Sequence, residues 1–290
     1  MAASKDWPDY PLPAARSPQR LDLCNTSIDP GPVLSNAIPA QTAAHWLLAL
    51  AVNGILISLA QPLPLLTRAG WIHAGLLGTL LWGCLGAAGW WAVVAYLALG
   101  SAVTRLGLRR KQEQGLAEAR GGRRGPENVW GSALTGTVLA VLVPLSPPAW
   151  RPLLLIGFAA SFAAKLADTF GSEIGKRWGR HTLLITSLRP VPPGTEGAVS
   201  LEGTAASLAG SALMALILLA LGVLPDGFSW GLVTAVGLAA TLLESWLGAT
   251  VQQRVAWLTN EVINGLQTLV AALLAMGAAR LLSSAALPGG

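Results

Sequence analysis

A group of polar residues that could act together begins where a strongly apolar stretch ends. They are Lys165, Asp168, Thr169, Ser172 and Glu173. Their spacing of i, i+3, i+4, i+7 and i+8 would place them on one face of a helix. Mg²⁺ takes one or two protein carboxylates and completes its coordination with water and substrate phosphate. We therefore expect Asp168 and Glu173 to bind Mg²⁺ and, with Lys165, to act in catalysis; a structural Lys165–Asp168 ion pair is the alternative.

A turn rich in proline and glycine follows at residues 186–197. It ends in Gly194, Thr195, Glu196 and Gly197. Glycines allow backbone N–H groups to approach an anion, as in phosphate-binding loops, and Arg189 adds a cation. The turn is not a Walker A loop, which needs Lys and then Ser or Thr after its second glycine. A phosphate-binding turn is our prediction, and an ordinary connecting loop is the alternative.

The helix expected after this turn begins at Ser200, where a polar N-terminus could extend the phosphate site. Ser200 could instead only cap the helix. Further along, Glu244 and Ser245 interrupt an apolar stretch, and Gln252 follows shortly after it. A carboxylate at such a position needs a cation or a metal as its partner. We therefore add Glu244 to the catalytic group, and Ser245 and Gln252 to the substrate-binding residues.

Two amides, Asn260 and Asn264, begin the last apolar stretch with a spacing of i, i+4. Amides on one helix stripe can orient phosphates, or they can hold neighbouring helices together. We expect them to bind substrate, because the other polar groups are expected at the same membrane face.

The composition determines what must position these residues. Hydrophobic residues make up 53% of the 290 residues and charged residues 11%, with a mean hydropathy of +0.55. This is too apolar for a soluble domain and predicts an all-α, polytopic transmembrane bundle. The expected spans are about 43–60, 70–87, 89–104, 130–148, 152–168, 200–223, 230–248 and 263–282. Eight spans need a turn near Gly86-Ala87-Ala88-Gly89; without that turn there are seven.

The proline-rich residues 1–42 are predicted to be a disordered tail, and residues 43–290 the membrane domain. The net charge of +5 does not indicate nucleic-acid binding, because most basic residues fall in loops between apolar stretches. All but Lys5, Arg16, Arg20, Arg151 and Arg280 lie on or near one expected face, the cytoplasmic one. That face carries the loops 105–128, 169–199 and 249–262, whereas 149–151 and 224–229 are expected opposite. The sequence indicates no oligomeric state.

Four motifs in order carry a family resemblance: KLADTFGSEIGK, VPPGTEGAVSLEGTAAS, LLESWLGATVQ and LTNEVINGLQTLVAAL. They resemble the integral-membrane family that contains phytyl-phosphate kinase and the animal transmembrane protein 19. The resemblance runs from about Arg105 to the C-terminus. GGRRGPENVWGSA at 121–133, which includes Arg124 and Asn128, is similar to the cyanobacterial and plastid members. The sequence departs from the family at Phe170, where Trp is common, and at Glu196 and Glu261, where Asn is common.

The resemblance implies conversion of phytyl phosphate to phytyl diphosphate for tocopherol and phylloquinone synthesis, with a nucleoside triphosphate such as CTP as donor. It also implies a plasma or thylakoid membrane of a phototroph. The substrate-binding residues are then Arg124, Asn128, Thr169, Ser172, Arg189, Gly194, Thr195, Glu196, Gly197, Ser200, Ser245, Gln252, Asn260 and Asn264. Phosphoryl transfer to a phosphate needs charge neutralisation and positioning more than a protein nucleophile.

Two other classes remain open from the residues alone. One is a prenyl-phosphate transferase, although the Asp-rich signature of the alcohol phosphatidyltransferases is absent. The other is a transporter of small anions or lipid phosphates, which also uses polar groups at helix ends. A transporter predicts polar residues spread through the bilayer, whereas here they gather at one face.

Overall fold

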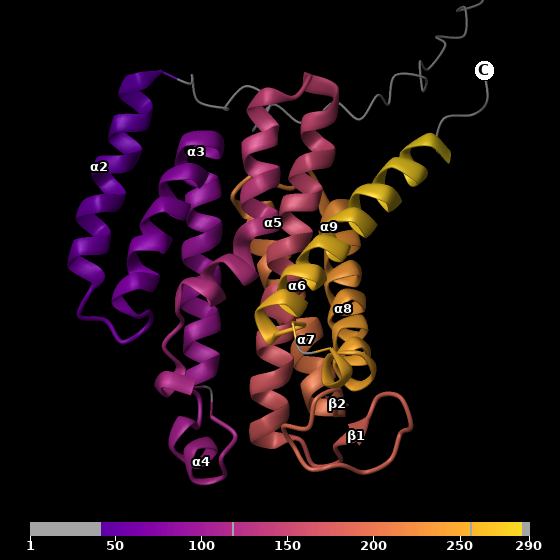
Figure 1. Cartoon of the computed structure of the whole chain (residues 1–290). Coiled ribbons are helices and arrows are strands. Elements are labelled where there is room, and N and C mark those ends of the chain that lie inside the picture. The colour runs from indigo at the N-terminus through magenta and orange to yellow at the C-terminus, as the bar shows by residue number, and fades with distance from the viewer. Residues whose placement is uncertain (1–41, 118, 256, 286–290) are drawn as a thin grey trace, which may run out of the picture.

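The computed structural model describes residues 42–117, 119–255 and 257–285, which include most of the expected membrane domain but only Thr42 of the expected tail (Figure 1). Seven of the described helices are long and apolar enough to cross a membrane, which confirms the predicted all-α bundle. They are α2 (Ala43–Ala60), α3 (Arg68–Arg105), α5 (Pro126–Leu145), α6 (Arg151–Trp178), α7 (Leu201–Ala220), α8 (Gly227–Thr250) and α9 (Asn260–Ala285).

Helix α3 is folded back on itself. Gly86, inside the stretch where the sequence predicts a turn, has φ +66° and ψ −156°. Gly70 and Gly100 both lie against Arg124: a Cβ atom on them would come within 2.6 Å of its carbonyl oxygen and 3.0 Å of its guanidinium, respectively. A straight helix would separate these two glycines by about 45 Å. The two arms of α3 therefore cross separately, and the seven helices provide eight crossing segments (Figure 1).

Helix α6 is the centre of the bundle and packs against α3, α5, α7, α8 and α9. Of its apolar window 83% is buried, against at most 44% in any other span. Its 28 residues span about 42 Å, longer than the roughly 30 Å of a bilayer core. The span expected at 152–168 therefore ends too early, because hydropathy marks the end of the apolar surface and not of the helix. Residues 169–178, expected in a loop, are helical.

Small residues bring α7 close to α6. A Cβ atom on Gly203 would lie 2.9 Å from the carbonyl oxygen of Gly171, and one on Gly210 would lie 3.0 Å from that of Leu166. Such close approach of two helix backbones is typical of small-residue interfaces in membranes. It places the start of α7 beside the polar part of α6.

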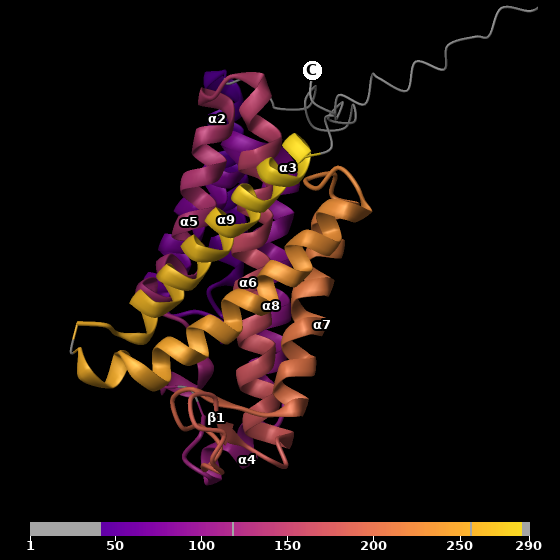
Figure 2. The ribbon, with the colours of Figure 1, turned by 90° about the vertical axis from the view of Figure 1, so that its right-hand side faces the viewer.

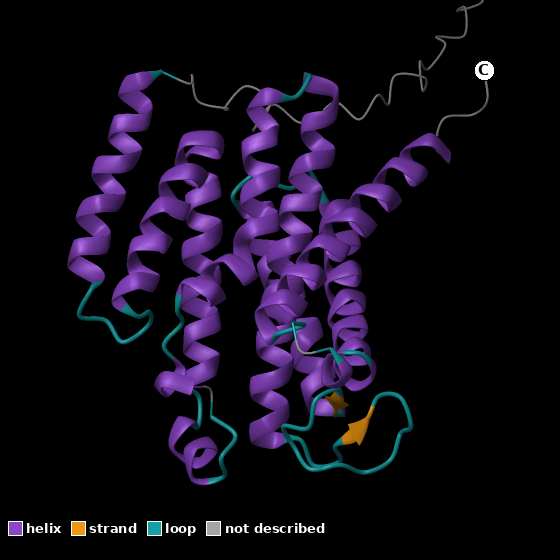
Figure 3. Ribbon diagram, viewed as in Figure 1, coloured by secondary structure: helices purple, strands orange, loops and turns teal. Residues whose placement is uncertain are grey.

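The connections between helices fall on the two ends of the bundle as their charges predict. The connections 106–125, 179–200 and 251–259 lie at one end, whereas 146–150 and 221–226 lie at the other (Figures 1 and 2). The first of them contains the short helices α4 (Leu108–Glu113) and η1 (Ala119–Gly122). The second contains the antiparallel strands β1 (Leu183–Leu184) and β2 (Ala198–Val199), the strands in Figure 3. The cytoplasmic assignment of this end stays a prediction.

Candidate functional site

A cavity of about 400 Å³ opens at the end of the bundle that holds these three connections. Its walls come from the second arm of α3, the start of α5, the loop 182–200 and helices α6, α7, α8 and α9. Most of the residues selected from the sequence line it. They are Arg124, Asn128, Lys165, Asp168, Thr169, Ser172, Gly194, Thr195, Glu196, Gly197, Ser200, Glu244, Ser245, Asn260 and Asn264.

Glu173 is not among the lining residues, and this corrects the expected metal pair. It lies five positions after Asp168, which turns the two side chains about 140° apart around the helix. Its carboxylate is 2% exposed and accepts a hydrogen bond from Lys111 of α4, while Lys176 Nζ lies 3.6 Å from its other oxygen. Asp168 and Glu173 therefore do not face a common site.

Arg189 and Gln252 also lie away from the cavity. Arg189 is exposed near the tip of the loop that leaves β1, where its backbone carbonyl accepts from Leu184 N–H at 2.9 Å. Gln252 begins the short helix η3 (Gln252–Arg254), and its side-chain carbonyl is buried without a described hydrogen-bond donor. The sequence places both in the correct connections but cannot give the direction of the side chains.

Lys165 joins two helices at the inner end of the cavity. Its ammonium group pairs with Asp168 one turn further along α6 and donates to Asn264 Oδ1 of α9 at 2.7 Å. The ion pair named as the alternative from the sequence is therefore present, within the cavity wall. An ammonium group has three donors, so Lys165 retains one for a ligand beyond its two described partners.

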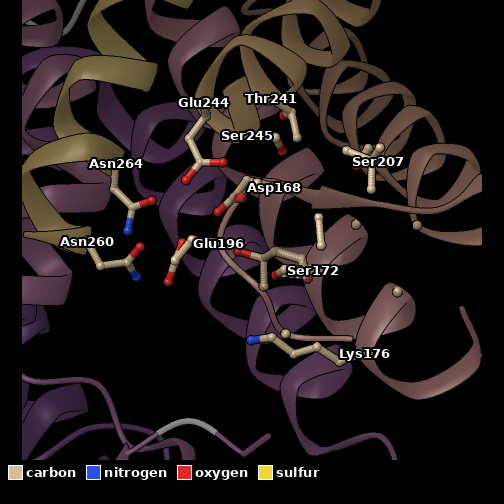
Figure 4. Close-up of a pocket in the computed structure, with 18 of the residues that line it drawn as sticks. Asp168, Ser172, Lys176, Glu196, Ser207, Thr241, Glu244, Ser245, Asn260 and Asn264 are labelled. Carbon is tan, nitrogen blue, oxygen red and sulfur yellow. Dashed lines mark hydrogen bonds between the residues drawn. The ribbon is translucent and has the colours of Figure 1, made fainter. Parts of the chain in front are cut away.

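Three carboxylates, those of Asp168, Glu196 and Glu244, lie around one space in the cavity (Figure 4). Glu244 and Glu196 make no hydrogen bond or ion pair with the residues that the structure describes. Within those residues, no three His, Cys, Asp or Glu side chains are close enough to hold a metal by themselves. An ion that takes one or two carboxylates and completes its coordination with water and phosphate fits this arrangement. One or two of the three carboxylates of Asp168, Glu196 and Glu244 could therefore hold Mg²⁺.

The glycine turn is fixed against α8 at the outer rim of the cavity. Gly194 and Gly197 have φ values of +86° and +75°, which favour glycine. A Cβ atom on Gly197 would lie 2.6 Å from Ser245 O and 2.8 Å from Ala249 N of α8. The ladder of β1 and β2 closes the loop behind the turn, with Ile185 N–H donating to Gly197 O at 3.0 Å. The turn is therefore held in place at the cavity.

Several of the expected ligand groups also have structural partners. Ser200 caps α7 by accepting from Gly203 N–H at 3.1 Å, and Thr169 donates to the carbonyl of Lys165 at 3.0 Å. The Asn128 amide accepts from Gly125 N–H at 3.0 Å and donates to Glu261 Oε1 of α9 at 3.1 Å. These residues line the cavity while also stabilising its walls.

The structure adds residues that the sequence did not assign to the site. They include Tyr96, Arg120, Arg123, Ser132, Lys176, Thr182, Thr204, Ser207, Thr241 and Glu261. Tyr96 is the most informative of them, because its hydroxyl accepts from Arg124 at 3.0 Å. A tyrosine in a transmembrane stretch usually finds a partner for its hydroxyl when it is buried. The position of Tyr96 within an apolar stretch is therefore the sequence feature that could have identified it as a site residue.

Comparison with known proteins agrees with this architecture. The family model described as Integral membrane protein DUF92 matches residues 51–272. The chain belongs to the DUF92 integral membrane family. The DUF92 match begins well before Arg105, so it also includes part of α2 and all of α3.

Two relatives of this DUF92 protein are similar over most of its length. The uncharacterized membrane protein sll0875 of Synechocystis is 46% identical over 249 residues, which cover 84% of this chain and 95% of the relative. Protein VTE6, chloroplastic, of Arabidopsis thaliana is 41% identical over 227 residues, which cover 76% of this chain and 67% of the relative. Cyanobacterial and chloroplast relatives fit a plasma or thylakoid membrane. No solved structure matches the chain.

Proposed function

We propose that the protein is a phytyl-phosphate kinase, which transfers a phosphoryl group from a nucleoside triphosphate to phytyl phosphate. The observation that carries the proposal is the convergence of carboxylates, cations and a glycine turn in one cavity at one end of a membrane bundle. The family that the sequence resembles contains phytyl-phosphate kinase, and the identity to VTE6 is 41%. The product would serve tocopherol and phylloquinone synthesis.

The reaction joins two anions. An oxygen of the acceptor phosphate attacks the γ-phosphorus of the donor, the bond to the β–γ bridging oxygen breaks, and a nucleoside diphosphate leaves. The acceptor is a phosphate monoester, which is largely dianionic at neutral pH because its second pKa is about 6. It therefore attacks without a protein base, and the protein has to position both substrates and stabilise their charge.

Different charged residues of the cavity would bind different phosphate groups. Lys165 and Arg124 would bind phosphate oxygens at the inner end, and Lys176 and the backbone of Gly194–Gly197 would bind those at the outer rim. Mg²⁺, held by Asp168 and Glu244, would neutralise phosphate charge. Bound between α6, α8 and the loop 182–200, the reacting phosphates would be separated from bulk water, where hydrolysis of the donor competes.

The test is an assay of purified protein in detergent with phytyl phosphate, Mg²⁺ and each of CTP, ATP, GTP and UTP in turn. Phytyl diphosphate and the nucleoside diphosphate are quantified by mass spectrometry. We expect equal amounts of both products with at least one donor, and CTP is the first candidate. Asp168→Asn should lower the yield of both products by about 100-fold or more, and Asp226→Asn, at the opposite end of the bundle, is the matched control. Folded protein that forms no phytyl diphosphate with any donor would overturn the proposal.

A further inference from the structure

Arg124 is a buried cation without a carboxylate partner among the described residues. Its side chain is 8% exposed and lines the cavity. Its guanidinium donates to Tyr96 OH at 3.0 Å and lies 5.3 Å from the centre of the Tyr96 ring. A guanidinium carries five N–H donors, and the described residues provide an acceptor for only one of them.

The other buried cations differ from Arg124 in this respect. Lys111 pairs with Glu173, and Lys165 pairs with Asp168. Burial of a charge is costly unless an opposite charge or strong hydrogen bonds compensate for it. Tyr96 is neutral, so its hydroxyl and ring compensate only in part. An anion that enters the cavity would provide the missing acceptors, and a phosphate suits a guanidinium in charge and geometry.

The chain holds this guanidinium in place before any ligand binds. The backbone of Arg124 donates to Leu65 O at 3.1 Å and accepts from Thr67 N–H at 3.0 Å, which forms a parallel bridge with Leu66. Gly100 leaves the space that the guanidinium occupies, because a Cβ atom there would lie 3.0 Å from Nη2. A site whose cation is already positioned loses little side-chain entropy on binding.

We infer that Arg124 and Tyr96 together bind the phosphate monoester of the lipid acceptor, and not the phosphates of the nucleotide. This inference rests on the proposed function and assigns one substrate to one part of its cavity. The Tyr96 ring lies 5.9 Å from that of Phe162, a fully buried residue of the bundle core. The Arg124 end of the cavity therefore borders apolar side chains.

The Tyr96 and Phe162 rings beside this end suit a hydrocarbon chain better than the polar ribose and base of a nucleotide. A prenyl phosphate carries only hydrocarbon beyond its phosphate. The outer rim, with the exposed Gly194 and Glu196, offers the nucleotide contact with water. Tyr96 accepts a hydrogen bond from Arg124 and has its own O–H to donate to the same phosphate.

The first experiment measures binding without catalysis. Protein in nanodiscs is titrated with farnesyl monophosphate, then with CTP, in the absence of Mg²⁺, and affinity is read by calorimetry. We expect Arg124→Gln to weaken binding of farnesyl monophosphate by about tenfold or more, since hydrogen bonds to charged groups are lost. Tyr96→Phe, which keeps the ring and removes only the hydroxyl, should weaken it by about threefold to tenfold. Binding of CTP should stay within twofold of wild type.

Arg109→Gln is the matched control, because it removes an exposed arginine from the same connection. It should bind both ligands as wild type does. Thermal unfolding and size-exclusion profiles of each variant check that the fold is retained. If Arg124→Gln fails to fold, Tyr96→Phe decides the question alone. Unchanged affinity for farnesyl monophosphate in the folded variants, or a selective loss of CTP binding, would overturn the inference.

Steady-state kinetics then separate this inference from the proposed function. In a protein that forms phytyl diphosphate, Tyr96→Phe should raise KM for phytyl phosphate and leave KM for the nucleotide unchanged. A raised nucleotide KM instead would overturn the assignment while the kinase function stands. If wild type forms no product yet farnesyl monophosphate binds and Arg124→Gln abolishes binding, the phosphate site stands and the kinase proposal fails.

Discussion

Lys111 of α4 donates a hydrogen bond to Glu173 of α6, and the two side chains are 1% and 2% exposed. Lys111 also donates to the carbonyl of Thr104 at the end of α3, at 2.7 Å. The pair therefore fixes the connection 106–125 to the central helix across a sequence separation of 62 residues. The pair thereby helps to hold the connection that carries Arg124 against the helix that carries Lys165.

Loss of Lys111 should destabilise the protein. Lys111→Met leaves the buried Glu173 carboxylate without its main partner, and breaking a buried ion pair costs about 3–5 kcal/mol. We expect a clear fall in the thermal unfolding midpoint in detergent, with much of it restored in Lys111→Met/Glu173→Leu, where neither charge remains. Arg110→Met, an exposed neighbour, should change stability by no more than about 0.5 kcal/mol. A single variant as stable as wild type would show that the pair is not a fixed contact.

Neutralising the cavity carboxylates should act on turnover and not on insertion. Asp168→Asn and Glu244→Gln each remove a candidate Mg²⁺ ligand, so we expect kcat to fall by about 100-fold or more. Residual rates should need higher Mg²⁺ concentrations for saturation. Glu173→Gln, in contrast, should lower stability and leave the Mg²⁺ dependence of the remaining activity as in wild type. Initial rates over a Mg²⁺ titration check this, and a Mg²⁺ shift specific to Glu173→Gln would restore Glu173 to the metal site.

Asp226 offers a test of the arrangement of the two ends. It caps α8 by accepting from Ser229 N–H at 2.7 Å, in the connection at the opposite end from the cavity. Asparagine caps helices about as well as aspartate, so Asp226→Asn should leave both stability and turnover within twofold of wild type. A large loss of turnover in well-folded Asp226→Asn protein would contradict the placement of the cavity at the other end.

Gly197 should tolerate no side chain. Gly197→Ala adds strain at φ +75° and places a methyl group against the backbone of α8, close to Ser245 O and Ala249 N. We expect a displaced turn and a KM for the nucleotide raised at least severalfold. Gly115→Ala is the control, because Gly115 has φ +69° and a Cβ atom added there would meet nothing within 4 Å. Equal effects of the two substitutions would attribute the loss to backbone strain alone.

The sequence predicts the transmembrane architecture well, because hydropathy reports burial in lipid directly. Span 43–60 coincides with α2, and the turn near Gly86 is placed correctly. The sequence does not predict the end of a helix that continues past its apolar surface, as α6 does beyond Asp168. Beyond that point the side chains face the cavity or partners from distant segments, so hydropathy does not report where the helix ends.

The sequence predicts which residues belong to the candidate site more completely than it predicts how their side chains are oriented. Motif residues such as Asp168, Glu244 and Asn264 all line one cavity, since charged and amide groups in transmembrane helices have few alternative uses. Spacing alone predicts that Glu173 shares a helix face with Asp168, but its partner Lys111 lies in a separate connection. Such a contact depends on tertiary packing, which a single sequence does not display.

The bridge between Leu66 and Arg124 also has a consequence for biosynthesis. The ribosome makes the loop that follows α2 long before it makes residue 124, with the whole folded-back α3 in between. The part of the cavity wall that contains Arg124 therefore forms only after the first three crossing segments have entered the bilayer. The connection 106–125 must then pair with the loop that follows α2. Nascent chains released before that return would be inserted in the membrane yet have no anion pocket.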